Sequence, residues 1–172
     1  MTAIIYYYSR SGTTKKIAKE LAKKLGCDAE MVDDGINRTG FFGFIRSGFQ
    51  ATRKKTFPLK PLAHMPSDFD LIIIGTPIWG GTMSSPVLSL IRANKKKIKA
   101  AAFFSTAGDV KERQCFARME DALGKPPVAK LHLGKQDIKD GYANKMKKFL
   151  GAIKDHEGRT KGTDGKKKAS GE

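Results

Sequence analysis

Three short segments combine hydroxyl side chains, glycine and, in one case, tryptophan in a way that suits a phosphate and a flat ring. The first segment leads directly into a predicted helix and reads Ser9-Arg10-Ser11-Gly12-Thr13-Thr14. The N-terminus of a helix offers unpaired amide N–H groups and a dipole that favours an anion. Gly12 lets the backbone approach such an anion closely. Serine and threonine are also common as ordinary helix caps, so the segment alone leaves both interpretations open.

The second segment holds the only tryptophan of the chain and reads Gly75-Thr76-Pro77-Ile78-Trp79-Gly80-Gly81-Thr82. A tryptophan on a loop beside two glycines is poorly explained by core packing, whereas a planar ligand would use its face. The alternative is that the ring of Trp79 folds back over the sheet edge. The third segment is another loop of small residues, Ser105-Thr106-Ala107-Gly108-Asp109. The sequence therefore predicts one segment suited to a phosphate and two suited to a flat ring.

Other kinds of site are disfavoured by the same reading. The first segment lacks the lysine of the GxxxxGK[ST] pattern, which disfavours nucleoside triphosphate hydrolysis, and it does not match the GxGxxG dinucleotide fingerprint. Cys27 and Cys115 lie far apart and outside any CxxC spacing, which favours idle thiols over a disulfide or redox pair. The three histidines have no metal-ligand spacing among them, so no metal site is expected.

The elements that must position these segments alternate between strand and helix. Apolar, β-rich runs predict strands at residues 3–8, 28–33, 70–75, 98–105 and 128–133. Helical periodicity predicts helices at residues 13–25, 84–93 and 111–123, and a last helix from about residue 139 to 153. This alternation predicts a doubly wound α/β fold with five parallel strands in the order 2-1-3-4-5 and helices on both faces. The order reverses between the first and third strands, and ligands bind at such a switch point.

Length and charge limit the possibilities further. The 172 residues suit one domain, predicted at 1–154, followed by a polar tail at 155–172 that is disordered by composition. Lys and Arg number 33 against 17 Asp and Glu, a net charge of +16 that resides mainly on the folded body. Such a charge favours acidic proteins, anionic cofactors, nucleic acid or anionic lipid, or simply solubilises the surface. No leader-like or membrane-spanning run is visible, so a cytoplasmic location is expected.

The three segments together resemble those of the flavodoxins and their FMN-dependent reductase relatives. The resemblance covers roughly residues 2–153 and implies FMN as the cofactor. It implies that the FMN phosphate is wrapped by Ser9, Arg10, Ser11, Gly12, Thr13 and Thr14. It implies that the isoalloxazine is lined on its inner side by Thr76, Pro77, Ile78, Trp79 and Gly80, with Gly81 following in the same cofactor loop and Trp79 stacking on the ring. The pyrimidine edge and ribityl chain would meet Ser105, Thr106, Ala107, Gly108 and Asp109.

Three features depart from the family pattern. The sequence has no aromatic residue between Ser105 and Phe116, where flavodoxins place a tyrosine over the outer flavin face, so that face is expected to be open. The net charge of +16 should favour the anionic reduced flavin and give a less negative potential than in acidic relatives. Residues 39–57 read as a basic helix with an aromatic face, which serves either as the second crossover helix or as a surface for a partner, a second copy or an anionic membrane.

Two functions compete on this sequence. The first is a flavoprotein electron carrier that moves single electrons between redox partner proteins, the partner being acidic, with no catalytic residue of its own. The alternative is an oxidoreductase, either an NAD(P)H-dependent FMN quinone or flavin reductase or a protoporphyrinogen-oxidase-like flavodoxin relative. The open outer face favours the enzyme, and the lack of an obvious catalytic acid favours the carrier in electron transport. Nucleic-acid binding would explain only the charge, and the basic residues are dispersed over all the predicted helices.

Overall fold

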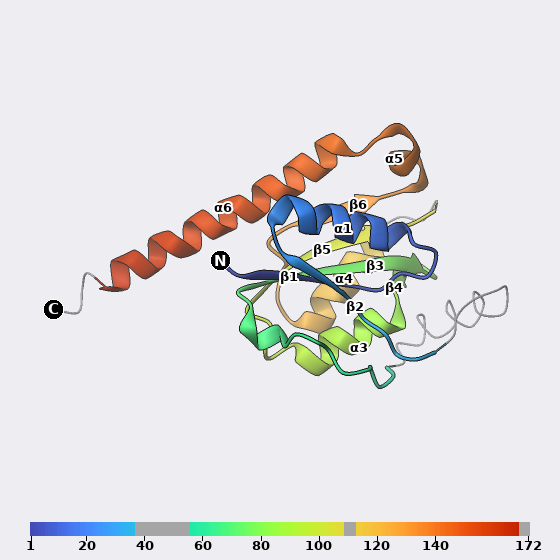
Figure 1. Cartoon of the computed structure of the whole chain (residues 1–172), viewed down its shortest axis with the longest axis horizontal. Helices are drawn as coiled ribbons and strands as arrows, with labels where there is room; N and C mark the ends of the chain where they lie inside the picture. The colour runs from blue at the N-terminus through green and yellow to red at the C-terminus, as the bar shows by residue number, and fades with distance from the viewer. Residues whose placement is uncertain (37–55, 109–112, 169–172) are drawn as a thin grey trace.

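Five parallel strands form the central sheet of the described residues (Figure 1). The structure is a computed structural model that describes residues 1–36, 56–108 and 113–168. The parallel strands are β1 (Ala3–Tyr7), β2 (Asp28–Met31), β3 (Leu71–Trp79), β5 (Ala100–Thr106) and β6 (Lys130–Leu133). They lie in the order β2-β1-β3-β5-β6, and the two-residue β4 (Thr82–Met83) pairs antiparallel with the end of β3. The parallel strands therefore have the predicted flavodoxin-like order 2-1-3-4-5, and this prediction is confirmed.

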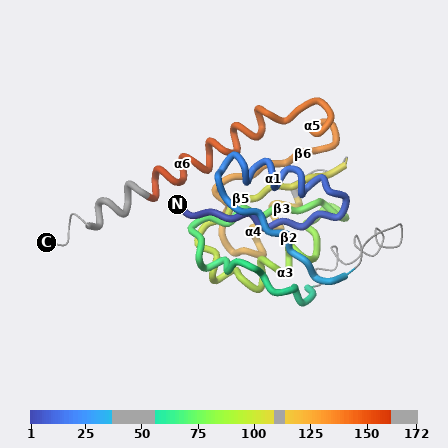
Figure 2. Tube along the Cα trace, viewed as in Figure 1, coloured from blue at the N-terminus to red at the C-terminus, as the bar shows by residue number. Residues whose placement is uncertain are grey.

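Helices cover both faces of the sheet (Figure 2). The helices are α1 (Thr13–Leu25), α3 (Ser85–Asn94), α4 (Arg113–Leu123), α5 (Lys135–Asp140) and α6 (Ala143–Lys168), with a 3₁₀ turn η1 (Pro66–Asp68). α1 and α6 bury their apolar side chains in one core, and α3 and α4 bury theirs in a second core on the opposite face. Ile17 and Leu21, four residues apart on α1, are both fully buried, as the helical spacing predicts.

The central strand β3 explains why the sheet has two cores. Leu71 and Ile73 belong to the core under α1 and α6, whereas Ile72 and Ile74 belong to the core under α3 and α4. Successive side chains of a strand point to opposite faces, so a strand covered on both sides needs apolar residues at every position. The continuous apolar run seen in the sequence is the consequence.

β3 is longer than the sequence predicts. The predicted strand ends at residue 75, whereas β3 continues to Trp79 and then turns back through Gly80 and Gly81 into β4. The extension forms because Thr76 and Pro77 still pair in register with Ser105 and Thr106 of β5. The second chemical segment is therefore a strand end and a tight hairpin instead of an open loop.

The C-terminal region differs most from the prediction. Gly141, with a φ of 109°, separates α5 from α6, where the sequence predicts one helix from about residue 139. α6 then continues to Lys168, whereas a disordered tail is predicted from residue 155. The amino group of Met1 lies 3.3 Å from the Glu157 carboxylate, which holds the first residues of that region on the domain. Extending a helix from a packed helical segment costs far less than nucleating a new one.

The predicted basic helix at 39–57 falls almost entirely on residues 37–55, outside the described residues. Among the helices that the structure describes, none combines the length and apolarity that crossing a membrane requires.

The two cysteines are unpaired, and both thiols are held protonated. Burial, with a contribution from the Asp28 carboxylate, raises the pKa of Cys27 to about 11. Burial raises the pKa of Cys115 to about 12, although the nearby Arg118 guanidinium acts in the opposite direction. Only a thiolate reacts as a nucleophile, and its fraction falls tenfold for each pH unit below the pKa.

We therefore expect both thiols of the folded protein to react with Ellman's reagent at pH 8 about 100-fold or more slowly than free cysteine does. Unfolding in guanidinium should restore the normal pKa values and release both thiols quickly, which provides the control. A fast reaction of one thiol in the native protein would contradict the placement of that cysteine.

Candidate functional site

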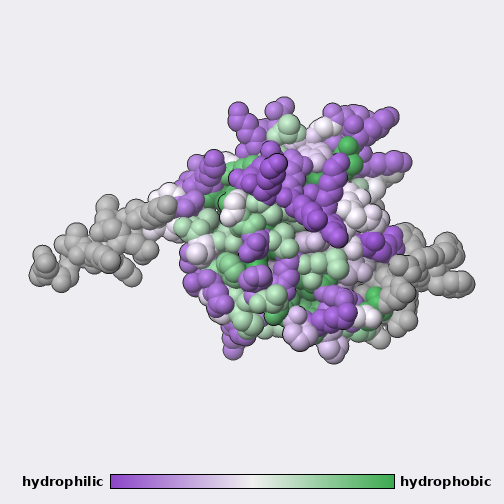
Figure 3. Space-filling view, in the orientation of Figure 1, coloured by the Kyte–Doolittle hydropathy of each residue, from purple (hydrophilic) through white to green (hydrophobic). Residues whose placement is uncertain are grey.

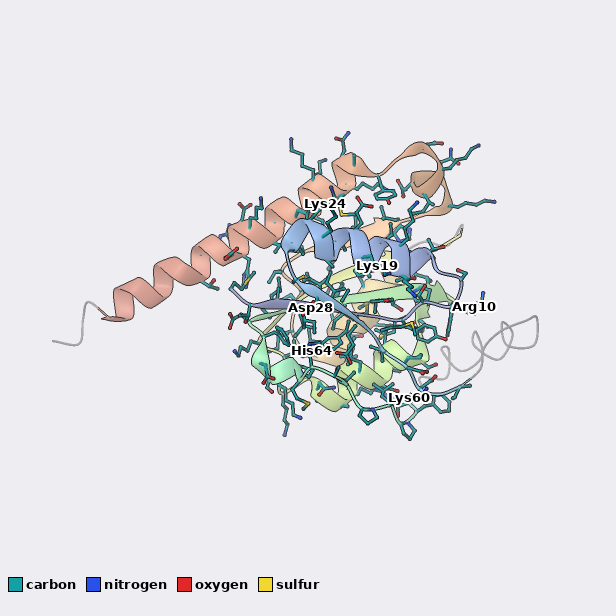
Figure 4. The ribbon with its side chains drawn as sticks, viewed as in Figure 1. Arg10, Lys19, Lys24, Asp28, Lys60 and His64 are labelled. Carbon is teal, nitrogen blue, oxygen red and sulfur yellow. The ribbon has the colours of Figure 1, made fainter. Side chains whose placement is uncertain are left out.

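The described parts of the three segments at residues 9–14, 75–82 and 105–109 meet at the carboxyl edge of the sheet. The amide of Tyr8, just after β1, donates to the Gly75 carbonyl at 3.1 Å. The hydroxyls of Thr14 and Thr106, at the start of α1 and the end of β5, lie 2.8 Å apart and are buried. Figure 4 shows Arg10 beyond the strand ends at this edge. The topology thus brings together segments that are up to 92 residues apart in the chain.

The N-terminus of α1 is arranged to receive an anion. Gly12 is the N-cap residue in a left-handed conformation with a φ of 92°, so it provides no capping side chain, and the first turn contains no acidic residue. The Ser9 hydroxyl oxygen is buried and has no hydrogen-bond partner among the described residues. Burying an unpaired hydroxyl is unfavourable unless a partner arrives. The segment therefore combines uncapped amide donors with a hydroxyl that needs an acceptor or donor.

Trp79 packs against the protein's own side chains. Its side chain is 7% exposed. The Tyr8 ring meets it edge to face, with centroids 5.3 Å apart and planes at 82°. The Arg10 guanidinium carbon lies 5.7 Å from the centre of the indole ring, within the range of a cation–π contact. This is the arrangement of the alternative interpretation, in which the ring folds back over the sheet edge, and stacking of Trp79 on a ligand stays a prediction.

Several of the predicted site hydroxyls are used to hold the strand ends together. The Thr76 hydroxyl accepts from the Ser84 amide at 3.0 Å, which fixes the turn from β4 into α3. The Ser105 hydroxyl lies 2.9 Å from Nδ1 of His132 on β6. With the Thr14–Thr106 pair, these contacts position the three loops, and the hydroxyls concerned are not directed to solvent.

Burial divides the predicted site residues into three groups. The exposed members are Ser11, Gly12, Gly80 and Gly108. The half-buried members are Ser9, Arg10, Thr13, Pro77, Gly81 and Ala107. The buried members are Thr14, Thr76, Ile78, Trp79, Ser105 and Thr106. Asp109 lies outside the described residues.

Sequence reasoning missed two neighbours of the site. The sequence predicts Tyr8 as the last residue of the first strand, but β1 ends at Tyr7 and the Tyr8 ring contacts Trp79. His132, an interior residue of β6, reaches the Ser105 hydroxyl. An aromatic residue immediately after a strand was an available signal for Tyr8. No local pattern marks His132, because its role depends on how β5 and β6 pair.

The described residues of the site carry a single charged side chain. Arg10 is the only ionisable Lys, Arg, Asp or Glu side chain among the described residues of the three segments. These residues therefore offer a positive charge and hydrogen-bond donors, and no carboxylate for proton transfer. The arrangement can hold an anion and a flat group, while acid–base chemistry would need residues from elsewhere.

Comparisons with known proteins show which solved structures share this fold. No family model matches the sequence, and no curated protein matches it. A flavoprotein in complex with FMN from Lactobacillus acidophilus NCFM has a similar structure, with 21% identity, a TM-score of 0.65 and coverage of 81% of this chain and 97% of that one.

Two further solved structures are similar over most of their length. Oxidised flavodoxin 1 from Bacillus cereus has 16% identity and a TM-score of 0.50, with 90% of this chain and 98% of that chain covered. The apo form of an NADH:FMN oxidoreductase has 14% identity and a TM-score of 0.53, with 91% and 88% covered. At these identities the likeness shows the flavodoxin-like fold.

Proposed function

We propose that this chain binds FMN at the carboxyl edge of its sheet and acts as a one-electron carrier between redox partner proteins. The observation that carries the proposal is the buried Ser9 hydroxyl without a partner among the described residues, beside the uncapped N-terminus of α1. FMN, when bound, supplies the redox chemistry, and the protein supplies binding, orientation and electrostatics. The fold agrees with those of the FMN-complexed flavoprotein and the flavodoxin described above.

The first segment fits the phosphate end of FMN. The amide groups at the start of α1 point to the space that an anion would occupy, and the helix dipole favours negative charge there. Ser11 and Gly12 are exposed and Thr13 is half-buried, so this end of the helix is accessible. Ser9 would donate its hydroxyl to a phosphate oxygen, which removes the cost of burying it unpaired.

The second segment fits the flat end of FMN through Trp79. Arg10 covers the indole ring at 5.7 Å, and an isoalloxazine stacked on that face would compete for this position. We therefore expect Arg10 to leave the ring when FMN binds and to turn its positive charge toward the phosphate. Trp79 is the only tryptophan, so its emission reports this step without interference.

A carrier is favoured over an enzyme by what the site lacks among its described residues. The described residues of the three segments contain no carboxylate that could move a proton, and Asp109, the one carboxylate of these segments, lies outside the described residues. A carrier needs no such group. The alternative is an NAD(P)H-dependent quinone or flavin reductase, or a protoporphyrinogen-oxidase-like relative. Its support is the lack of an aromatic residue between Ser105 and Phe116, which leaves room for a second flat group over the flavin, and the fold likeness to an NADH:FMN oxidoreductase.

The proposed partner of the carrier is an acidic redox protein. Five exposed lysines project from α1 into the hydrophilic surface seen in Figure 3, and α1 begins at the candidate site. These lysines are Lys15, Lys16, Lys19, Lys23 and Lys24. A surface of this kind speeds association with an acidic partner, and the rate falls as salt screens the charges. An anionic membrane surface would be attracted by the same charges and is the less specific alternative.

The test is a titration with FMN followed by anaerobic reduction. We expect FMN to quench the Trp79 emission saturably with one site per chain, and the bound flavin to be reduced in two separate one-electron steps. NADH and NADPH should leave the flavin oxidised over the same time. Rapid reduction by either nucleotide would establish the reductase instead, and a titration without saturable quenching or a flavin spectral change would overturn FMN binding altogether.

A further inference from the structure

A cavity lies beside the β3–β4 hairpin, lined by residues of α3 and α4. The cavity has a volume of about 500 Å³, with Thr82 and Met83 of β4 at its floor. Its charged lining consists of Arg92 and Lys95 from the end of α3 and of Arg118 and Asp121 from α4. Thr82 is the last residue of the second segment, whereas none of the four charged residues belongs to the three segments of the candidate FMN site. The volume is sufficient for a small organic molecule.

The lining is strongly cationic. Three positive side chains face one carboxylate, so the cavity carries a net charge of about two positive units at neutral pH. Arg92 and Lys95 lie at the C-terminal end of α3, where positive side chains are also favoured by the helix dipole. That explanation does not extend to Arg118, which lies in the middle of α4.

Arg118 is the residue of the lining that most strongly indicates a ligand. Its side chain is half-buried, and its Nη1 atom is buried with no hydrogen-bond partner among the described residues. A guanidinium nitrogen removed from water without an acceptor is unfavourable, and the cost is larger for a charged group than for a neutral one. An anionic oxygen in the cavity would provide the missing acceptor.

We propose that this cavity binds a small molecule through a phosphate group. A phosphate dianion matches the net charge of the lining, and guanidinium groups bind phosphate through paired, planar N–H donors. Met83, Leu88 and Ala122 supply an apolar wall for the remainder of the molecule. The proposal stands independently of FMN, because it uses neither the N-terminus of α1 nor Trp79.

The cavity and the candidate FMN site share the β3–β4 hairpin. Thr82 pairs with Trp79 across the hairpin, so the same two-stranded turn forms the floor of the cavity and carries the indole ring. A ligand bound between α3 and α4 would therefore contact the element that positions Trp79. The phosphate ligand would therefore lie close enough to the redox site to act as a co-substrate or as an effector.

The test is calorimetric titration of the full chain with inorganic phosphate in a phosphate-free buffer. We expect saturable binding in the cavity with a Kd of about 1 mM or tighter. Arg118→Gln should weaken it at least tenfold, and Arg92→Gln, a change at an exposed position that leaves the fold intact, should weaken it several-fold. Lys96→Gln is the matched control, because Lys96 is exposed beside the cavity lining and its loss removes the same charge.

Phosphate bound at the α1 N-terminus is distinguished by Thr13→Glu, which should abolish that binding and leave cavity binding within twofold. The proposal is overturned if Arg118→Gln and Arg92→Gln both bind phosphate as Lys96→Gln does, or if all binding disappears in Thr13→Glu. It is also overturned if the unmodified chain shows no saturable binding. None of these results depends on whether FMN binds.

Discussion

Gly75→Ala should lower the free energy of unfolding by about 3 kcal/mol or more, among the largest effects available from a single added methyl group. An ideal Cβ at position 75 would lie 2.0 Å from Cζ of Phe104 and 2.3 Å from its Cε1. Phe104 is fully buried in the core under α1 and α6, so its ring has no space to retreat into. Gly75 pairs with Tyr7 on one side and Phe104 on the other, so β3 cannot shift without disturbing both neighbouring strands.

Urea denaturation followed by circular dichroism measures this loss as a fall in the midpoint at an unchanged slope. Gly151→Ala is the matched control, since a Cβ there meets nothing within 4 Å among the described residues and Gly151 lies inside α6. It should raise stability by up to about 1 kcal/mol, because alanine is the better helix former. Adding Phe104→Leu to Gly75→Ala should recover part of the loss, and a double mutant as unstable as the sum of its singles would argue against the clash.

The elements that sequence could predict are those whose cause is local. α1 is predicted and found at Thr13–Leu25, because its apolar spacing is regular and Gly26 ends it in a left-handed conformation with a φ of 63°. β3 is predicted from its apolar run as far as Gly75. Its continuation to Trp79 depends on pairing with β5, which no local pattern encodes.

The same distinction applies within the candidate site. The topology rule predicts that the loops after β1, β3 and β5 converge, and they do. Which hydroxyls remain available cannot be predicted from the sequence. Thr14 is hydrogen-bonded to Thr106, whereas Ser9 of the same segment has no hydrogen-bond partner among the described residues. The packing of Trp79 against Tyr8 likewise arises from a contact between distant parts of the chain.

Thr13→Glu should weaken FMN binding by about 100-fold, about 2.7 kcal/mol, while the protein without FMN becomes slightly more stable. Thr13 is the first residue of α1, whose first turn lacks an acidic side chain. A carboxylate there interacts favourably with the helix dipole, which should raise the free energy of unfolding by up to about 0.5 kcal/mol. The same carboxylate would repel the FMN phosphate at close range, where two unit charges interact by about 1 to 4 kcal/mol.

Two controls make this prediction specific to the phosphate. Thr13→Gln has nearly the same size as Thr13→Glu and no charge, so it should bind FMN within a few-fold of the unmodified chain. Riboflavin lacks the phosphate, so its affinity, measured by quenching of the Trp79 emission, should be equal in the Glu and Gln variants. Because stability and FMN affinity are expected to move in opposite directions, a general loss of structure cannot imitate the result. Equal FMN affinity in the two variants would mean that the phosphate binds away from α1.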